Sequence, residues 1–544
     1  MKCPLCDSNK HKPYGKSANG FRKYCCKVCN NIFLDGIEVD IFTPEINFLK
    51  FKEKRLIHKK IARLRYQTSI LKNFLNKENK RINNNLNQLA NKIIKHRIDW
   101  TLVFEIYLLL PMNYSINKLK VSIDDFRQKN KKDISLFLLY LIPNLFKKIF
   151  SIIQTYRWGL VGFFIALSIY SFMCIWLRIN VNEPQPYDSY TLQALAWRSG
   201  HLELPQDYPW LEIAKYKGKY FLSFPPVPTI PMLLLTFLFG ERTPSTWLMI
   251  ICFFSSYGIA YKLLRRFQNS DFQSAIWAVF LICGSSYLDI SLFGWVWYMA
   301  QSLSFVLTIT CLLCLTYSSH KMQGFGLFCF ALTVGCRPLQ AIYTPLVVGI
   351  VYQKNHRSTI VESVKVIIPI LIPSTIVAII LGILNFLRFD SPLEFGHNYL
   401  PVLLAEPQFS FGYIERNFLR IFTVFPKISS LGQIDLPRFG GFAFYLANPI
   451  FIILAIRLII VTLTRKIDWF LCFLLASMML NFFVLMMHIT FGAWQFGTRF
   501  LVDLLPAVLV LCTRIKQPLR MHEILIMIFG LAFNVCGGIY FRSS

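Results

Sequence analysis

The chain has 544 residues, of which 54% are hydrophobic, and this composition excludes an ordinary soluble globular protein. The formal net charge is +29, and residues 1–150 hold 30 of the 58 lysines and arginines but only 12 of the 29 aspartates and glutamates. We therefore expect a basic, water-exposed front and a membrane body that begins near residue 151. Residues 1–40 lack the apolar core of a secretory signal, so we expect the N-terminus to stay in the cytoplasm.

Two pairs of cysteines open the chain, each with the spacing C-x-x-C. Cys3 and Cys6 form the first pair, and Cys26 and Cys29 form the second about twenty residues later. Two such pairs are typical of a tetrahedral zinc site with four thiolate ligands. Cytoplasmic thiols stay reduced, which favours a metal site over disulfides. Cys25 breaks the spacing and is left out of this predicted structural zinc site.

Residues 1–33 also resemble the zinc ribbon of insertion-sequence transposases, in which a glycine, an aromatic and a basic residue precede the second cysteine pair. Here these are Gly20, Phe21 and Arg22. The predicted ribbon spans residues 1–45, and a basic helical linker spans 46–150, in which 100–129 has the pattern of a helix-turn-helix. Lysine and arginine clusters beside a membrane favour contact with anionic lipid headgroups or protein. Contact with nucleic acid is the alternative.

The membrane body, residues 151–544, contains a series of long apolar stretches. Their lengths predict about eleven transmembrane helices. We place these near residues 158–178, 245–264, 272–290, 295–317, 322–336, 339–353, 361–386, 442–463, 467–488, 500–514 and 520–541.

The charges between these stretches predict how they are oriented. With a cytoplasmic N-terminus, every inner connection is basic, as the positive-inside rule requires. Those connections carry Lys262, Arg265, Arg266, Lys321, Lys354, Arg357, Arg465, Lys466, Arg514, Lys516 and Arg520. Residues 224–240 are also apolar, but counting them as a span would reverse every later connection. Their four prolines favour a partly embedded segment instead.

The first outer loop, residues 182–231, is a polar island between apolar stretches. It carries five carboxylates, and charged groups close to a bilayer are usually functional or paired. Asp188 comes just before a short amphipathic helix predicted over residues 191–198. Its structural interpretation is a helix cap, and its functional interpretation is an active-site carboxylate. We interpret the island as the active-site loop of a membrane enzyme.

Four motifs together resemble bacterial GT-C fold glycosyltransferases, which are related to protein O-mannosyltransferases and to lipid A aminoarabinose transferase. The first is Asp188 ahead of its amphipathic helix. The others are the sets Glu212, Tyr216, Gly218, Tyr220 and Phe224-Pro225-Pro226; Asn385, Arg388, Phe389, Ser391, Pro392, Phe395 and Gly396; and Phe496-Gly497-Thr498-Arg499. Ser189 stands where the O-mannosyltransferases have the second acid of an Asp-Glu pair. The resemblance covers residues 157–541 and implies an all-α polytopic bundle with a large first outer loop.

The resemblance also implies a donor sugar carried on a polyprenyl phosphate and displayed on the outer face of the cytoplasmic membrane. Asp188 is then the candidate general base that takes the proton of the acceptor hydroxyl. Glu212 is the second candidate catalytic carboxylate, with a lysine partner or sugar hydroxyls as its alternative contacts. The resemblance does not identify the acceptor, which could be a glycan, a lipid or a protein. Nor does the transfer site require a metal.

Positively charged side chains must stabilise the lipid phosphate as it leaves. Arg337 and Arg499 are flanked by apolar residues on the expected outer face, and an arginine fork suits phosphate oxygens. Lys217 and Lys219 are further candidates for substrate binding. Tyr190 and His397 are candidate sugar contacts, although aromatic belts and structural histidines are the ordinary alternatives.

A transporter or flippase of lipid-linked sugars is the rival hypothesis for the membrane body. Transporters place charges near the mid-plane and show internal repeats, whereas here the carboxylates gather on one face and no repeat is visible. The enzyme is therefore favoured. A DNA-linked membrane regulator is a third hypothesis, which depends on residues 1–130 alone.

Overall fold

The computed structural model describes residues 11–16, 22–27, 32–34, 154–267, 269–428, 434–464, 469–514 and 519–543. It divides into two compact units, Met1–Asp133 and Ile134–Ser544. The linker of residues 46–150, its helix-turn-helix pattern and the three basic connection residues Arg465, Lys466 and Lys516 all lie outside the described residues.

The N-terminal unit contains a small antiparallel sheet with strand order β1-β2-β3. Its strands are β1 (His11–Lys16), β2 (Arg22–Cys26) and β3 (Ile32–Leu34). Cys26 ends β2 and pairs with His11 across the sheet. The other three predicted zinc ligands, Cys3, Cys6 and Cys29, lie outside the described residues, so the zinc site stays a prediction.

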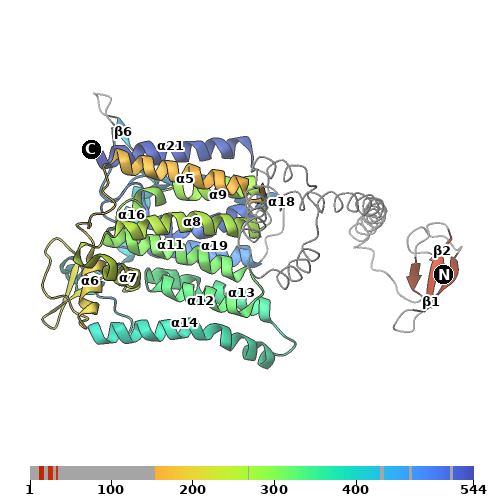
Figure 1. Cartoon of the computed structure of the whole chain (residues 1–544). Helices are drawn as coiled ribbons and strands as arrows, with labels where there is room; N and C mark the ends of the chain where they lie inside the picture. The colour runs from red at the N-terminus through yellow and green to blue at the C-terminus, as the bar shows by residue number, and fades with distance from the viewer. Residues whose placement is uncertain are drawn as a thin grey trace, which may run out of the picture. The chain divides into compact units, whose positions relative to one another are not determined.

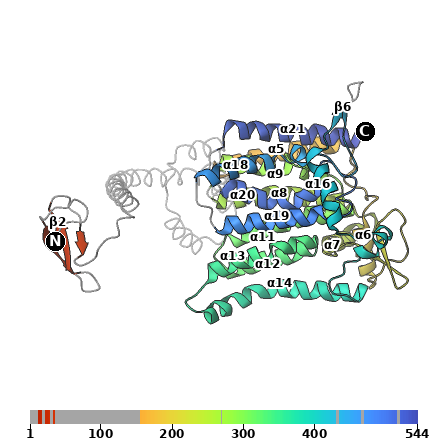
Figure 2. The same ribbon diagram turned by 180° about the vertical axis from the view of Figure 1, so that it is seen from behind.

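The second unit is a bundle of helices, drawn side by side in Figures 1 and 2. Helix is present in each of the eleven stretches that the sequence predicts. The helices of these stretches are α5 (Arg157–Trp176), α8 (Thr246–Arg266), α9 (Asp271–Cys283), α10 (Tyr287–Ile290), α11 (Val296–Leu315), α12 (His320–Val334), η2 (Pro338–Tyr343), α13 (Thr344–Asn355), α14 (Ile360–Phe389), α17 (Phe444–Ala447), α18 (Ile450–Thr464), α19 (Trp469–Met486), η5 (Arg499–Leu504), α20 (Leu505–Arg514) and α21 (Met521–Ser543).

Six of the helices in the described part of the chain are long and apolar enough to cross a membrane: α5, α8, α11, α14, α19 and α21. A helix satisfies its backbone hydrogen bonds internally, which is the condition for crossing lipid. The apolar helices Asp271–Cys283 and Ile450–Thr462 are shorter. The chain is therefore a multi-pass, mainly helical membrane protein.

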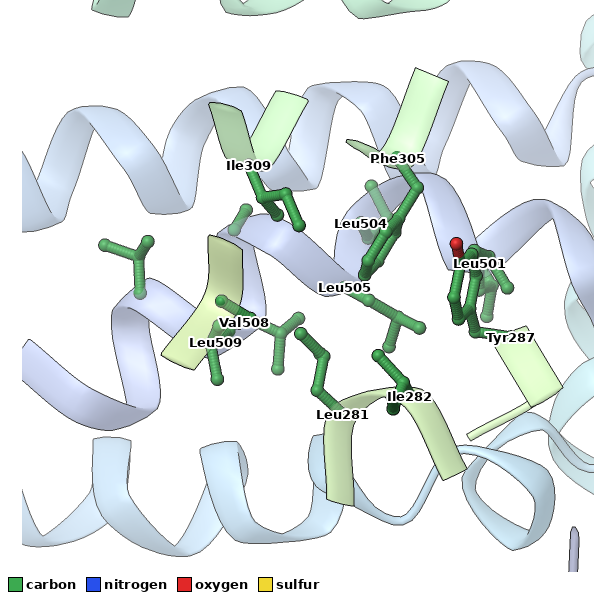
Figure 3. Packing of buried hydrophobic residues seen from close by; sticks show 14 of the residues in the cluster. Leu281, Ile282, Tyr287, Phe305, Ile309, Leu501, Leu504, Leu505, Val508 and Leu509 are labelled. Atoms are coloured by element: carbon green, nitrogen blue, oxygen red, sulfur yellow. The ribbon is translucent and has the colours of Figure 1, made fainter. Parts of the chain in front are cut away.

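The helices differ in how much of their surface the bundle covers. In α11, 67% of the most apolar window is buried, whereas in α14 the share is 17%. Helix α11 thus lies inside the bundle, and α14 presents most of its apolar surface to the surroundings. Side chains from α9, α10, η5 and α20 pack around α11 in the core. Leu281, Tyr287 and Leu505 are among them, and Phe305 of α11 lies in the same cluster (Figure 3).

Four of the predicted spans are interrupted rather than continuous, and one of them, residues 442–463, forms α17 and then α18. Residues 272–290 form α9 and then the short α10; residues 339–353 and 500–514 each begin as a 3-10 helix, η2 or η5, before the α-helix starts. Residues 224–240 contain only the eleven-residue helix α7 (Thr229–Phe239). At 1.5 Å per residue this helix is too short to cross a bilayer, in agreement with its exclusion from the predicted spans.

The connecting segments gather mainly at one end of the bundle, which we call the polar end (residues 177–245, 284–295, 335–343, 390–449 and 487–504). Figure 1 shows α6, α7, α16, β6 and the C-terminus at this end. Its elements outside the predicted spans are α6 (Ser189–Arg198), β4 (Ile213–Tyr216), β5 (Lys219–Leu222), α7, η1 (Gly240–Arg242), η3 (His397–Tyr399), α15 (Pro401–Ala405), η4 (Phe411–Tyr413), α16 (Ile414–Thr423), β6 (Lys427–Ile428) and β7 (Ile434–Asp435). The two β-hairpins are a departure from the predicted all-α loops.

Candidate functional site

Asp188 caps the amphipathic helix α6, as its structural interpretation predicts. Its Oδ1 accepts from the backbone N–H of Thr191 at 3.0 Å, and its Oδ2 accepts from the Thr191 hydroxyl at 2.5 Å. The side chain is buried, and burial raises the pKa of Asp188 to about 6, although the hydrogen bonds from Thr191 oppose the rise. Each carboxylate oxygen has a further lone pair, so capping does not exclude a proton-accepting role.

Glu212 lies just ahead of β4 and is held by two segments. Its Oε2 accepts from the indole N–H of Trp297 at 3.2 Å, and its backbone carbonyl accepts from the Ser223 hydroxyl at 2.6 Å. Although Glu212 is exposed, partial loss of hydration raises its pKa, while the Trp297 hydrogen bond and the charge of Arg499 oppose the rise. The second candidate carboxylate therefore lies within electrostatic range of a candidate phosphate-binding arginine.

The island and the N-terminus of α11 are joined directly. The backbone N–H of Val296 donates to the carbonyl of Tyr187 at 2.8 Å. The ring of Tyr187 lies 5.4 Å from Trp295 and 5.6 Å from Trp297. These contacts bring Asp188, the next residue, to the same helix end that holds Glu212 through Trp297.

Tyr190 is fully buried, and its hydroxyl donates to the carbonyl of Pro225 at 3.2 Å. Its pKa is raised well above the usual range by burial, and the nearby charges of Arg337 and Arg388 oppose this. Tyr190 therefore lies near two arginines that belong to other segments. Its hydroxyl is already bonded within the protein, which leaves the proposed sugar contact without support from hydrogen bonding.

Lys217 and Lys219 lie in the β4–β5 hairpin and point to the surface. Lys217 and Gly218 both have positive φ, 48° and 77°, which is the geometry of a tight two-residue hairpin turn. Lys217 is paired with Asp390 at 2.5 Å, and Lys219 with Glu203 at 3.0 Å. Both lysines are well exposed, so the structure places them in surface ion pairs.

The same hairpin explains why two of the motifs occur together. The Tyr216 hydroxyl donates to Asp390 at 2.7 Å, and the Tyr216 ring lies 5.9 Å from Phe389 and 4.8 Å from Tyr399. The hairpin of the second motif thus docks on the residues that end α14, which belong to the third motif. The first and second outer segments are fixed to each other at this point.

Arg388, at the last turn of α14, is a buried cation that was not among the predicted site residues. Its terminal nitrogens donate to the carbonyl of Leu222 at 3.4 Å and to Oδ1 of Asn385 at 2.8 Å. Both terminal nitrogens are therefore engaged within the protein. We interpret Arg388 as a brace between α14 and β5.

His397 is close to a second histidine, His488, which the sequence analysis did not single out. Their rings lie 6.4 Å apart, and His397 also lies 5.6 Å from Phe224 of the island. Burial lowers the pKa of His397 to about 4 and that of His488 to about 3. Both imidazoles are therefore neutral at physiological pH. The ring of His488 in turn lies 5.2 Å from the ring of Phe500, which contacts Arg337 and Arg499.

Arg337 has an acidic partner that was not expected from the sequence. Its Nε and Nη2 both donate to Oδ2 of Asp503, at 2.9 Å and 2.7 Å. The Asp503 side chain is 2% exposed. Gln301 donates to its Oδ1 at 3.1 Å, and Gln340 donates to its backbone carbonyl at 3.2 Å. Asp503 lies only four residues after Arg499 in the sequence, and this closeness was the available signal.

Arg499 is buried and differs from Arg337 in its partners. Its Nε donates to the carbonyl of Gly492 at 3.1 Å, and its guanidinium lies 5.8 Å from the ring of Tyr298 and 5.0 Å from that of Phe500. Within the described residues no carboxylate lies within 4.0 Å of this guanidinium, and its terminal nitrogens have no hydrogen-bond partner. Arg499 is therefore a buried cation without an ion-pair partner among the described residues, and Glu212 and Asp503 act on it only at longer range.

Gly497 explains the spacing of the last motif. It has a φ of 65°, and a Cβ added there would lie 2.4 Å from the Cβ of Ala447. Only glycine fits this backbone without strain. The turn leads into η5, whose first residue is Arg499.

Two further features bound what the site can do. Among the residues that the structure describes, no group of three or more His, Cys, Asp or Glu side chains could hold a metal. An apolar hollow of about 510 Å³ lies on α14, lined by Thr375, Gly382, Phe386, Pro392 and neighbouring residues. It carries no charged side chain, so we assign no chemistry to it.

No known protein family and no curated protein matches the sequence. Among solved structures, the chain is similar to the oligosaccharyltransferase of Archaeoglobus fulgidus in its apo form, with 13% identity and a TM-score of 0.42. It is also similar to ArnT from Cupriavidus metallidurans bound to undecaprenyl phosphate, with 11% identity and a TM-score of 0.41. The two alignments cover 72% and 70% of this chain. They span only 56% of the archaeal chain and 63% of the ArnT chain.

Proposed function

We propose that this membrane protein is a glycosyltransferase that moves a sugar from a polyprenyl phosphate to an acceptor hydroxyl. The observation that carries this proposal is the arrangement at the polar end. A buried carboxylate with a raised pKa, Asp188, and an uncompensated buried cation, Arg499, are connected there through α11. Such a pair has the two functions that transfer from a lipid phosphate requires.

The first function is proton removal. As the acceptor oxygen attacks the anomeric carbon, its proton passes to a carboxylate oxygen of Asp188, and the bond between the anomeric carbon and the phosphate oxygen breaks. A base with a pKa close to the working pH is effective in this role. The pKa of about 6 fits, since Asp188 is then mostly ionised at neutral pH yet more basic than an exposed aspartate.

The second function is stabilisation of the leaving group. The electron pair of the broken bond stays on the polyprenyl phosphate, which gains negative charge. A fixed cation aimed at that charge in a water-poor site lowers the barrier. The free terminal nitrogens of Arg499 offer the bidentate contact that phosphate oxygens prefer. Glu212, which accepts a hydrogen bond from Trp297, would contact sugar hydroxyls.

The location of the reaction is part of the proposal. Basic side chains cluster at the end of the bundle away from the island, as in Arg265, Arg266 and Lys354. The positive-inside rule then puts that end in the cytoplasm and the polar end on the outer face. The lipid-linked donor would be used there.

The test is to delete the protein and to identify polyprenyl-phosphate sugars by mass spectrometry. We expect one such lipid to accumulate, and to return to its normal level when the wild-type chain is restored but not when Asp188→Asn is restored. If no lipid-linked sugar changes, or if Asp188→Asn restores the normal level, the proposed reaction is wrong. Accumulation on the cytoplasmic side alone would instead support the flippase hypothesis.

A further inference from the structure

Three arginines meet around two aromatic rings at the polar end: Arg337, Arg499 and Arg542, which we call the arginine cluster. Arg337 and Arg499 both lie within 5.0 Å of the ring of Phe500. Arg499 and Arg542 lie 5.8 Å and 5.5 Å from the ring of Tyr298. Arg499 thus stands between the other two.

The outer two members of the cluster are each neutralised. Arg542 donates through Nε and Nη2 to both oxygens of Asp289, at 2.9 Å and 2.7 Å. Arg337 also donates through Nε and Nη2, but both nitrogens donate to the same oxygen of Asp503. Arg499 has no such partner among the described residues. Two acid–arginine pairs therefore flank Arg499, which is the one arginine of the cluster without an ion-pair partner among the described residues.

Asp503 is the carboxylate that neutralises Arg337, so it sets the net charge of the arginine cluster. It is almost completely buried, it is fixed by Gln301 as well as by Arg337, and it lies in the same 3-10 helix as Arg499. If Asp503 lost its charge, Arg337 would become a second uncompensated cation against the same ring of Phe500. In poorly solvated surroundings each unit charge acts strongly on a bound anion.

We propose that Asp503 is a specificity-determining residue that makes the site select a lipid carrying one phosphate over a lipid carrying a diphosphate. Asp503 offsets Arg337, so the cluster meets the anion with the single free charge of Arg499. A diphosphate brings additional negative charge for which no further free cation is present in the cluster. This inference rests on the proposed function, because it assumes that a lipid phosphate binds at Arg499.

The experiment compares two probes, undecaprenyl phosphate and undecaprenyl diphosphate, which differ by one phosphoryl group. Their dissociation constants are measured for the full purified chain in detergent. We expect the wild-type protein to bind the monophosphate more tightly. In Asp503→Asn, we expect the preference to fall by roughly tenfold or more, chiefly because the diphosphate binds more tightly.

A matched control comes from a second buried pair. Arg457 donates to both oxygens of Glu523, at 2.6 Å and 3.0 Å, between α18 and α21. The variant Glu523→Gln breaks a pair of the same kind outside the arginine cluster. It is expected to lower the melting temperature, as Asp503→Asn is, but to leave the preference between the two lipids unchanged.

Two more variants keep the proposal testable if Asp503→Asn does not fold. Arg337→Gln with Asp503→Asn removes both charges, so the preference should match the wild type. Arg337→Gln alone leaves Asp503 uncompensated, so the preference for the monophosphate should increase. An unchanged preference in either single variant would overturn the role of Asp503 alone. Failure of the wild-type chain to bind either lipid would overturn the proposed function together with this inference.

Discussion

Arg457 and Arg499 are both buried arginines in apolar surroundings, but their environments differ. Arg457 is bonded to both oxygens of Glu523 and to the carbonyl of Cys512, and it is 1% exposed. Arg499 is 6% exposed and has one carbonyl partner and two aromatic rings. The first arrangement satisfies the charge within the fold. The second leaves a charge without an ion-pair partner among the described residues, an arrangement that suits the proposed anion-binding role.

The largest expected effect concerns Asp188, the proposed general base. Asp188→Asn retains the size of the side chain and its ability to cap α6, because Asn caps a helix about as well as Asp. It removes the oxygen that accepts the proton, so turnover should fall by about 10²–10⁴-fold. Transfer from a polyprenyl-phosphate sugar by the purified protein measures this. Normal turnover in a folded variant would reduce Asp188 to a helix cap and make Glu212 the carboxylate to test.

The same carboxylate predicts a pH dependence. The pKa of Asp188 is raised to about 6, and only its deprotonated form accepts a proton. Turnover should therefore be lost as the pH falls through about 6 and be fully present above it. The two histidines, with pKa values lowered to about 4 and 3, do not titrate in this range. An acidic limb near the usual aspartate value of about 4 would contradict the assigned environment of Asp188.

The smallest expected effect concerns the surface lysines. Lys217 and Lys219 form exposed ion pairs, and such pairs contribute little. Lys217→Ala and Lys219→Ala should each leave turnover within about twofold of the wild type. A large loss of donor binding in either variant would return that lysine to the substrate site and weaken the distinction between paired and unpaired cations.

How much of the structure can be predicted from the sequence depends on the kind of pattern that each region contains. The apolar stretches predicted where the helices lie. The exclusion of residues 224–240 from the spans stays a prediction, although only Thr229–Phe239 is an α-helix there. The interruptions that create η2 and η5 were not predicted, because a long apolar run has the same composition whether its first turn is 3-10 or α. The zinc ligands and the basic linker stay predictions, since most of those residues lie outside the described part.

The candidate site also could be predicted only in part from the sequence. Asp188 and Arg499 were singled out from sequence motifs, and their roles stay predictions. The pairing of Arg337 with Asp503 joins residues 166 positions apart, and no local pattern predicts such a contact. His488 was missed for the same reason, since its neighbour His397 belongs to another outer segment. Sequence identified the chemical groups, but only the packing of α11, η2 and η5 shows which charges remain free.

The central claim, that Arg499 is kept uncompensated in order to bind a lipid phosphate, is tested most directly with Arg499→Gln. The measurement is the dissociation constant for undecaprenyl phosphate together with the melting temperature of the ligand-free protein. We predict that binding weakens by roughly tenfold or more, because a charged donor is lost. The melting temperature should be unchanged or higher, since a buried charge without a partner has been removed. Unchanged binding with a lower melting temperature would show that Arg499 supports the fold instead.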